Sequence, residues 1–225
     1  MGSKTFGQKA EDFYLGLKKP VNLPAGTIII NPYEKGEVKE ITKNFYSKFF
    51  NDENKRVFIF GINPGRFGGG LTGINFTDPV ALRKYCGIKN DLGDKRELSS
   101  QFIYELINAF GGVKKFYTKF FISALYPLAI LKDGKNYNFY NDNETYRYLK
   151  SRIISYMKEQ IEFGAKEELA ISLGKKNFNY LNEINNDIKF FKRIEFLEHP
   201  RFIMQYRRRK MDEFIKKYMI LLNLV

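Results

Sequence analysis

The 225-residue sequence is poor in the side chains from which most protein metal sites and cross-links are built. Cys86 is its one cysteine and His199 its one histidine. A single cysteine cannot form an internal disulfide or supply a cysteine-rich zinc or iron–sulfur site, and such scarcity is typical of a reducing cytoplasm. One histidine leaves a single possible centre for a histidine-based zinc site or a Ser-His-Asp triad. The composition therefore argues against these classes of site and favours a cytoplasmic location.

Long hydrophobic runs are also absent. The longest apolar stretch, residues 120–131, contains Ser123 and Pro127 and is well short of the roughly 20 residues that a transmembrane helix needs. The N-terminal sequence MGSKTFGQKA lacks an apolar signal core, and Phe6 stands where a myristoylation motif has serine or threonine. We therefore expect no membrane partner.

What the sequence has in excess is positive charge. Lys and Arg number 38 and Asp and Glu 25, which gives a net charge of +13 and an isoelectric point near 9.6. Aromatic residues make up 16% of the chain, too much apolar mass for a disordered basic tail. At roughly 150 residues per domain, the length suffices for one domain with a full core. We expect a single domain, residues 1–225, whose positive surface meets a polyanion.

Four short apolar runs have the length of β-strands. None alternates cleanly between apolar and polar residues, which is typical of strands buried on both faces of a parallel sheet. Apolar residues at helical spacing predict helices near 99–110, 143–164 and 211–222. This alternation favours an α/β fold with helices on both faces of an open parallel sheet. The four runs are residues 56–63, 120–126, 168–173 and 193–199.

Residues 1–51 are expected to form a mainly helical cover on a core made by residues 56–225. The elements predicted in the cover are a helix near 11–18, a strand at 28–30 and a helix near 37–50. Residues 132–143, with the sequence KDGKNYNFYNDN, predict a polar, asparagine-rich loop that is free to move.

The most informative segment is GINPGRFGGGLTGINF, residues 61–76, which follows the first run and holds six glycines and one proline. A loop so rich in glycine brings its backbone close to a ligand or to a neighbouring segment. Residues 68–73 match the G-x-G-x-x-G pattern of dinucleotide-binding proteins. That fingerprint opens directly into a helix, whereas the sequence that follows here, INFTDP, is typical of a turn. A nucleotide-binding enzyme that uses this loop is therefore a minor alternative.

Two polar residues stand at strand ends, Asn63 after the first run and His199 at the end of the fourth. The carboxyl ends of parallel strands meet at one edge of the sheet, so both side chains can face one pocket. A lone histidine is more often an ordinary core or turn residue. Its place at a strand end favours a functional role here.

Positive charge concentrates around and after His199. Residues 192–217 hold nine Lys or Arg against four Asp or Glu, a net +5 of the total +13. Most charge runs are solvated helix faces, but residues 207–210 fall in or near the first turns of the last predicted helix. There the helix macrodipole disfavours positive charge by about 0.3–1 kcal/mol per residue. Phosphate groups, which match arginine forks and helix starts, are the natural partner of this run.

The segments GINPGRFGGGLTGINF and EHPR, residues 61–76 and 198–201, resemble the signature motifs of the uracil-DNA glycosylase superfamily. The similarity is closest to its single-strand-selective monofunctional branch, in particular the bacterial second-type members. This resemblance implies a three-layer α/β/α sandwich on a central four-stranded parallel sheet. It also implies a monofunctional enzyme of base-excision repair that needs no metal or cofactor. Such an enzyme flips uracil or another deaminated base out of single- or double-stranded DNA and hydrolyses its N-glycosidic bond.

The same resemblance implies roles for individual residues. Asn63 would position the attacking water, and His199 would hydrogen-bond the O2 atom of the departing base. Gly65 stands where thymine-excluding members of the superfamily carry a bulky residue. The resemblance therefore also allows a base with substituents, or another damaged base, as the substrate. Ala124 stands where the branch has a uracil-reading asparagine; Ser123 or backbone groups must replace that contact, and xanthine or hypoxanthine are open as substrates. The expected base-pocket residues are Ile62, Gly65, Phe67, Phe76, Ser123 and Ala124.

In the family, the segment after His-Pro inserts a wedge into the duplex. Residues 201–204 are the wedge candidates here, and the basic residues beyond them would hold phosphates. The expected DNA-binding residues are Arg201, Phe202, Ile203, Met204, Arg207, Arg208, Arg209, Lys210 and Lys175. A monomer is expected. Because Ala124 replaces the asparagine, a DNA-binding protein of the same fold with weak or no activity is the main alternative.

Overall fold

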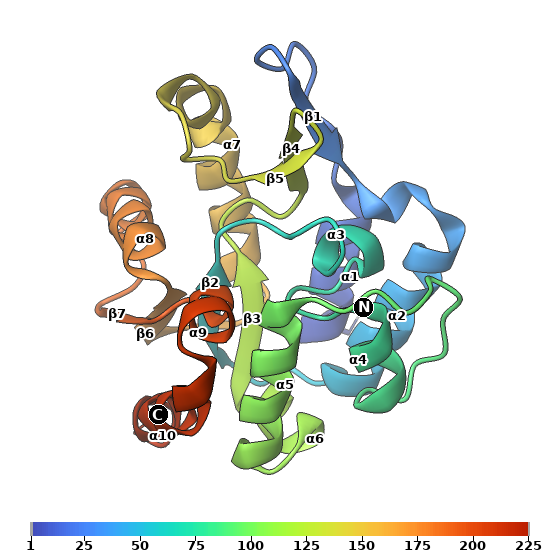
Figure 1. Cartoon of the computed structure of the whole chain (residues 1–225), viewed down its shortest axis with the longest axis vertical. Helices are drawn as coiled ribbons and strands as arrows, with labels where there is room; N and C mark the ends of the chain where they lie inside the picture. Colours follow the sequence, from blue (N-terminus) through green and yellow to red (C-terminus); the bar gives the residue numbers. More distant parts are fainter. Residues whose placement is uncertain (1, 225) are drawn as a thin grey trace.

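A four-stranded parallel sheet forms the centre of the molecule (Figure 1). The computed structural model describes residues 2–224. The strands lie in the order β3-β2-β6-β7, and the three neighbouring pairs are all parallel. They are β2 (Arg56–Gly61), β3 (Phe120–Ala124), β6 (Ala165–Leu173) and β7 (Ile194–Leu197). Each strand falls on one of the four predicted runs, so the predicted parallel sheet is confirmed.

Helices cover both faces of this sheet and complete three layers (Figure 1). One face carries α1, α7 and α8, and the other carries α5 and α6, with α9 and α10 packed beside α5. The predicted α/β/α sandwich is thereby confirmed. The bounds are α1 (Phe6–Gly16), α5 (Leu98–Phe110), α6 (Val113–Lys119), α7 (Asn143–Ile161), α8 (Lys175–Ile188), α9 (Pro200–Tyr206) and α10 (Met211–Leu222).

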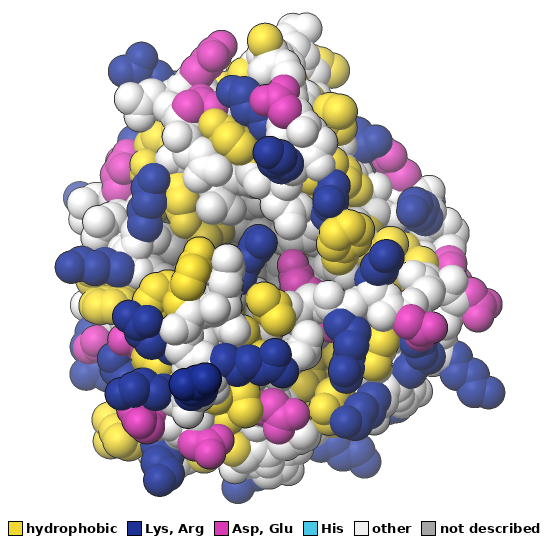
Figure 2. Space-filling view, in the orientation of Figure 1, with side chains coloured by type: hydrophobic (Ala, Val, Ile, Leu, Met, Phe, Trp, Pro, Cys, Tyr) yellow, Lys and Arg dark blue, Asp and Glu magenta, His cyan; other side chains and the backbone are white. Residues whose placement is uncertain are grey.

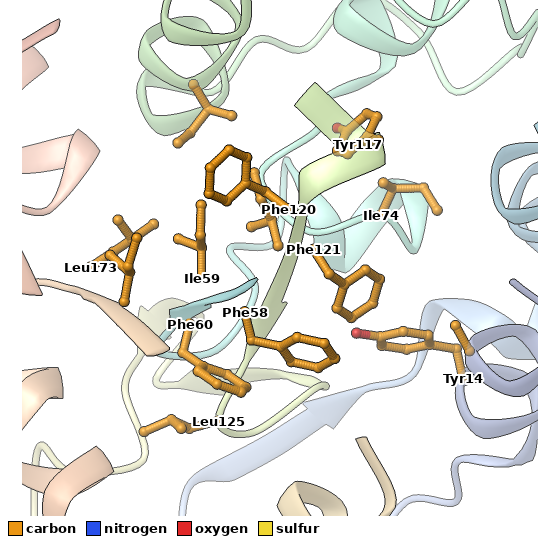
Figure 3. Close-up of a cluster of buried hydrophobic side chains, with 14 of the residues drawn as sticks. Tyr14, Phe58, Ile59, Phe60, Ile74, Tyr117, Phe120, Phe121, Leu125 and Leu173 are labelled. Atoms are coloured by element: carbon orange, nitrogen blue, oxygen red, sulfur yellow. The ribbon is translucent and has the colours of Figure 1, made fainter. Parts of the chain in front are cut away.

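The strands are apolar on both faces because both faces are buried. Phe120 and Phe121, adjacent on β3, point to opposite sides of the sheet (Figure 3). The ring centroid of Phe120 lies 5.1 Å from that of Phe116 in α6, whereas Phe121 lies 5.0 Å from Phe6 in α1. Burying each such side chain stabilises the fold by about 1.5–3 kcal/mol. The helix that holds Phe6 is thus part of the core, and it begins five residues before the predicted start at residue 11.

A second, antiparallel sheet was not predicted. It has the order β1-β4-β5, with β1 (Thr27–Ile30), β4 (Ala129–Lys132) and β5 (Lys135–Tyr137). The segment expected as a free polar loop is the hairpin between β4 and β5. Asp133 and Gly134 have φ angles of 51° and 71°, the left-handed pair that a tight two-residue hairpin turn requires. The prediction of a free loop is therefore wrong for residues 132–137, whereas residues 138–142 connect β5 to α7 without forming a helix or strand, as expected.

The basic run lies differently from the prediction. Residues 207–210 precede α10 and mostly form a short 3-10 helix, η2 (Arg208–Lys210). The first turn of α10 contains Asp212 and Glu213 instead, which suits the positive end of the helix macrodipole. The basic side chains are therefore not in the first turn of the last helix, and the dipole argument for a phosphate partner falls away. These basic side chains are exposed and follow α9, and these two observations still support a phosphate partner.

The remaining elements connect the core. None of the helices described between residues 2 and 224 combines the length and apolarity that crossing a bilayer needs. The connecting elements are η1 (Pro32–Glu34), α2 (Gly36–Phe49), α3 (Gly69–Thr72) and α4 (Pro79–Lys84).

Candidate active site

A cavity of about 520 Å³ opens at the carboxyl ends of the central strands. Each strand leads into its wall: Asn63 follows β2, Ala124 ends β3, Gly174 follows β6 and His199 follows β7. The space-filling view shows this face of the molecule hollowed near its centre (Figure 2). The structure thus brings Asn63 and His199 to one cavity, although 135 residues separate them in the chain.

The Asn63 side chain is held by the backbone that follows β5. Its Nδ2 donates to the Tyr137 carbonyl at 2.9 Å, and its Oδ1 accepts from the Phe139 N–H at 3.2 Å. Exchanging the amide nitrogen and oxygen would break both bonds, so the amide has one favoured orientation. Each bond uses only part of the amide, which leaves one N–H and one lone pair for a ligand.

His199 is placed as a neutral hydrogen-bond donor. It is the N-cap residue of α9, and its Nδ1 accepts from the Arg201 N–H at 3.1 Å. Desolvation, and secondly the charge of Arg201, lower the pKa of the imidazole to about 4. The ring is therefore neutral at pH 7, and because Nδ1 is an acceptor, the proton sits on Nε2.

Phe76 forms an aromatic wall of the cavity. Its ring lies against the backbone of Gly61, where an added Cβ would come within 2.5 Å of the ring. Phe76 itself has a φ of 53°, an unusual value for a non-glycine residue, and such strain clusters at functional sites. The ring centroid lies 5.9 Å from that of His199. Glycine at residue 61 is therefore required for this ring position.

The other expected base-pocket residues divide into two groups. Ile62, Gly65 and Ala124 line the cavity. Phe67 lies outside it and is 39% exposed. Ser123 is fully buried away from the cavity, where its hydroxyl bonds to the Tyr14 hydroxyl at 2.9 Å and to Gln160. Ser123 follows the strand alternation to the opposite face from Ala124 and therefore cannot replace the missing asparagine.

The expected DNA-binding residues also divide. Lys175, Arg201 and Phe202 line the cavity, and Phe202 is 43% exposed. Ile203 and Met204 are buried and therefore cannot enter a duplex, which corrects the expectation for these two wedge candidates. They occupy the face of α9 that packs on α5. Residues 207–210 are exposed, and Figure 2 shows Lys and Arg side chains gathered over the region of α9 and α10.

Several cavity residues were not identified from the sequence. Glu97, at the start of α5, has a carboxyl in the cavity wall; burial chiefly raises its pKa to about 7, with Arg201 opposing and Asp78 adding to the shift. Glu97 belongs to neither motif and to no predicted strand end, so no sequence signal distinguishes it. The hairpin and the segment after it also contribute Asn136, Tyr137, Asn138 and Tyr140.

Within residues 2–224, no group of three or more His, Cys, Asp or Glu side chains is arranged to hold a metal ion.

Comparisons with known proteins agree with this geometry. A model of the uracil DNA glycosylase superfamily matches residues 47–223. Among solved structures, the chain is similar to the crystal structure of Pedobacter heparinus SMUG2, with 41% sequence identity and a TM-score of 0.95 over 99% of this chain and 98% of that chain. No curated protein matches the sequence. The resemblance predicted from the two motifs is confirmed: the chain belongs to the uracil-DNA glycosylase superfamily, a family of DNA glycosylases.

Proposed function

We propose that this DNA glycosylase excises uracil or another deaminated base, as a monofunctional enzyme, by direct hydrolysis of the N-glycosidic bond. The family model and the likeness to SMUG2 support DNA as the substrate. The neutral His199 in one cavity with Asn63 carries the finer proposal. Flipping the base into this cavity costs a few kcal/mol, and least for mispaired or single-stranded bases.

Two groups divide the chemical work. As the C1′–N bond breaks, the sugar gains oxocarbenium character and the base takes the electron pair. Asn63 holds a water molecule near C1′ through its free N–H and lone pair. The water oxygen bonds to C1′ and its proton is lost to solvent, so one water is consumed for each base released.

His199 stabilises the base as negative charge develops on it. Its Nε2–H donates to the O2 atom of uracil, and a neutral imidazole is fixed for this by the Arg201 N–H on Nδ1. A preorganised donor of this kind typically contributes about 2.7–4 kcal/mol to transition-state stabilisation. Phe76 stacks on the base, and Phe202 fills the gap that it leaves in the DNA.

Replacing Asn63 by alanine tests the proposal. Asn63→Ala should lower the rate of single-turnover uracil excision by about 100-fold or more, because the attacking water is no longer held near C1′. The affinity for the oligonucleotide should change little. Asn179→Ala, an exposed asparagine on α8 outside the cavity, is the matched control and should keep the full rate. An Asn63→Ala rate equal to the control would refute the mechanism.

A DNA-binding protein without activity is the second candidate, because Ala124 lines the cavity where a base-reading asparagine is expected. Incubation with oligonucleotides that carry single lesions distinguishes the two. Release of uracil, hypoxanthine or xanthine by the wild-type protein eliminates the inactive candidate, whereas tight binding without any released base establishes it.

A further inference from the structure

We propose that Glu97 is a catalytic residue for purine substrates: its carboxyl group contacts the edge of the flipped base that faces Gly65 and protonates N7 of a deaminated purine as the base departs. This inference rests on the proposed function and deepens it, because it assigns a role to a group that uracil excision does not require.

The carboxyl of Glu97 fills the space above two glycines of the 61–76 loop. A Cβ added to Gly65 would overlap Oε1, and one added to Gly68 would overlap Oε2. The backbone of Glu97 is fixed by a hydrogen bond from its N–H to Asp78 Oδ2 at 3.0 Å. The absence of a side chain at residue 65 therefore does not leave an empty space for bulky bases. It makes room for a carboxyl group in the cavity wall.

This carboxyl has no hydrogen-bond partner among residues 2–224, and neither oxygen is sealed from the cavity. The charged groups that act on it are Arg201 of α9 and Asp78, the N-cap of α4. The hairpin contributes the uncharged Asn136, whose Nδ2 lies 3.7 Å from the position of a Cβ added to Gly65. Because burial raises its pKa to about 7, the group can hold a proton at neutral pH and donate it to a ligand.

The strand order indicates which edge of the base Glu97 meets. His199 follows β7, an edge strand, whereas Gly65 follows β2, two strands away towards the other edge. A base whose O2 side, or N3 side for a purine, faces His199 turns its opposite edge towards Gly65 and Glu97. That edge carries C5 in a pyrimidine and N7 in a purine. Only the purine therefore offers Glu97 a basic ring nitrogen.

Proton transfer to N7 completes a balanced hydrolysis. The C1′–N9 bond breaks and its electron pair passes to the ring, while the Glu97 proton moves to N7, so that hypoxanthine or xanthine leaves as a neutral molecule. The water oxygen bonds to C1′, and the proton released by this water restores the carboxyl. Uracil has no nitrogen at this edge and leaves as an anion that His199 stabilises.

The test compares two bases and two variants in single-turnover assays. Glu97→Gln keeps the shape of the side chain but cannot donate an acidic proton. It should reduce excision of hypoxanthine at least tenfold more than excision of uracil, since general acid catalysis typically contributes about 100-fold or more. Wild-type hypoxanthine excision should fall above pH 7, as Glu97 ionises, and uracil excision should lack this decline. Glu105→Gln, an exposed glutamate on the same helix, is the matched control.

Replacing N7 of hypoxanthine by C–H, in 7-deazahypoxanthine, removes the proposed acceptor from the base. This replacement also makes the base an intrinsically poorer leaving group, so the informative comparison is between the two proteins on the same base. Wild type and Glu97→Gln should excise 7-deazahypoxanthine at one rate, whereas they should differ on hypoxanthine. Equal losses on uracil and hypoxanthine would assign Glu97 a structural role, and a wild-type enzyme inert on hypoxanthine would also overturn the inference. Both results leave the proposed function intact, which fails only if no base is released.

Discussion

At the scale of single residues, Arg56 is the least expected feature of the core. Its side chain is fully buried between the rings of Phe6 and Phe50, 4.6 and 4.9 Å from their centroids. The guanidinium donates to the Tyr117 carbonyl and to both carboxylate oxygens of Asp52. Burial alone would raise the pKa of Asp52, but the bonds from Arg56 and from the Asn54 N–H outweigh it and hold this pKa below its ordinary value.

Removing the acidic partner should therefore be costly. Asp52→Asn should lower the free energy of unfolding by about 3 kcal/mol at pH 7, because a buried guanidinium loses its counter-charge. A carboxyl whose pKa is lowered by folding stabilises the protein above its unfolded pKa, and this contribution is lost as the pH falls through the folded pKa. The difference between variant and wild type in urea denaturation should thus be full at pH 7 and shrink below about pH 4.

Asp12→Asn provides the comparison, since Asp12 pairs with Lys4 while both side chains are mostly exposed. Its effect should stay within about 1 kcal/mol. Similar losses for the two variants would mean that burial of Arg56 does not depend on its partner.

Single residues also show where sequence reasoning reaches its limit. Asn63 and His199 are predictable because motifs and strand ends locate them. The predictions for Ser123 and Ile203 are wrong because neighbouring positions on a strand or helix point in different directions. A motif does not specify which of these directions leads to the cavity or to solvent. Glu97 has no motif, and its proximity to Gly65 exists only in the folded chain.

At the scale of elements, the β4–β5 hairpin orients the proposed catalytic asparagine. The Tyr137 carbonyl and the Phe139 N–H hold Asn63, and the Tyr137 hydroxyl donates to Asp142. Asp142 in turn caps α7 and pairs with Lys132 at 3.2 Å. Tyr137→Phe removes the hydroxyl that ties this end of the hairpin to Asp142 and keeps the aromatic ring. Single-turnover excision should fall about tenfold, because small displacements of a positioned group are costly, while DNA affinity remains within twofold.

Tyr180→Phe removes a hydroxyl that has no hydrogen bond among the described residues, and it should leave the rate unchanged. If Tyr137→Phe lowered affinity and rate together, the hairpin would contribute to DNA binding rather than to the orientation of Asn63. Binding is measured with an oligonucleotide whose 2′-fluoro nucleotide resists excision.

The hairpin was missed because its stabilising contacts are remote in sequence. Strand β5, residues 135–137, is short and mostly polar. Strand β4 pairs with β1, which lies about one hundred residues earlier in the chain, and places Leu131 opposite Ile28. The parallel strands were predictable because burial on both faces leaves an unbroken apolar run. A three-residue strand with an exposed face leaves no such pattern.

At the scale of the whole molecule, the net charge of +13 predicts that affinity for DNA depends on exposed Lys and Arg side chains. Arg208 and Arg209 are exposed in η2, beyond the helix that carries Phe202. If both contact phosphates, their joint replacement by alanine should weaken DNA binding and reduce the slope of log affinity against log salt by about two units, roughly one for each contact.

The position of these charges, not their number, should decide the effect. Lys55, just before β2, and Lys158, in the last turn of α7, lie at the opposite end of the sheet from the cavity. Replacing both lysines by alanine removes two positive charges, as the double arginine variant does. The slope of log affinity against log salt should stay within about half a unit of wild type, because counterions are released by phosphate contacts and not by net charge. Titrations from 50 to about 300 mM salt measure both slopes. Equal changes in the two double variants would show that DNA senses the general positive field of the protein instead of a track beside the cavity.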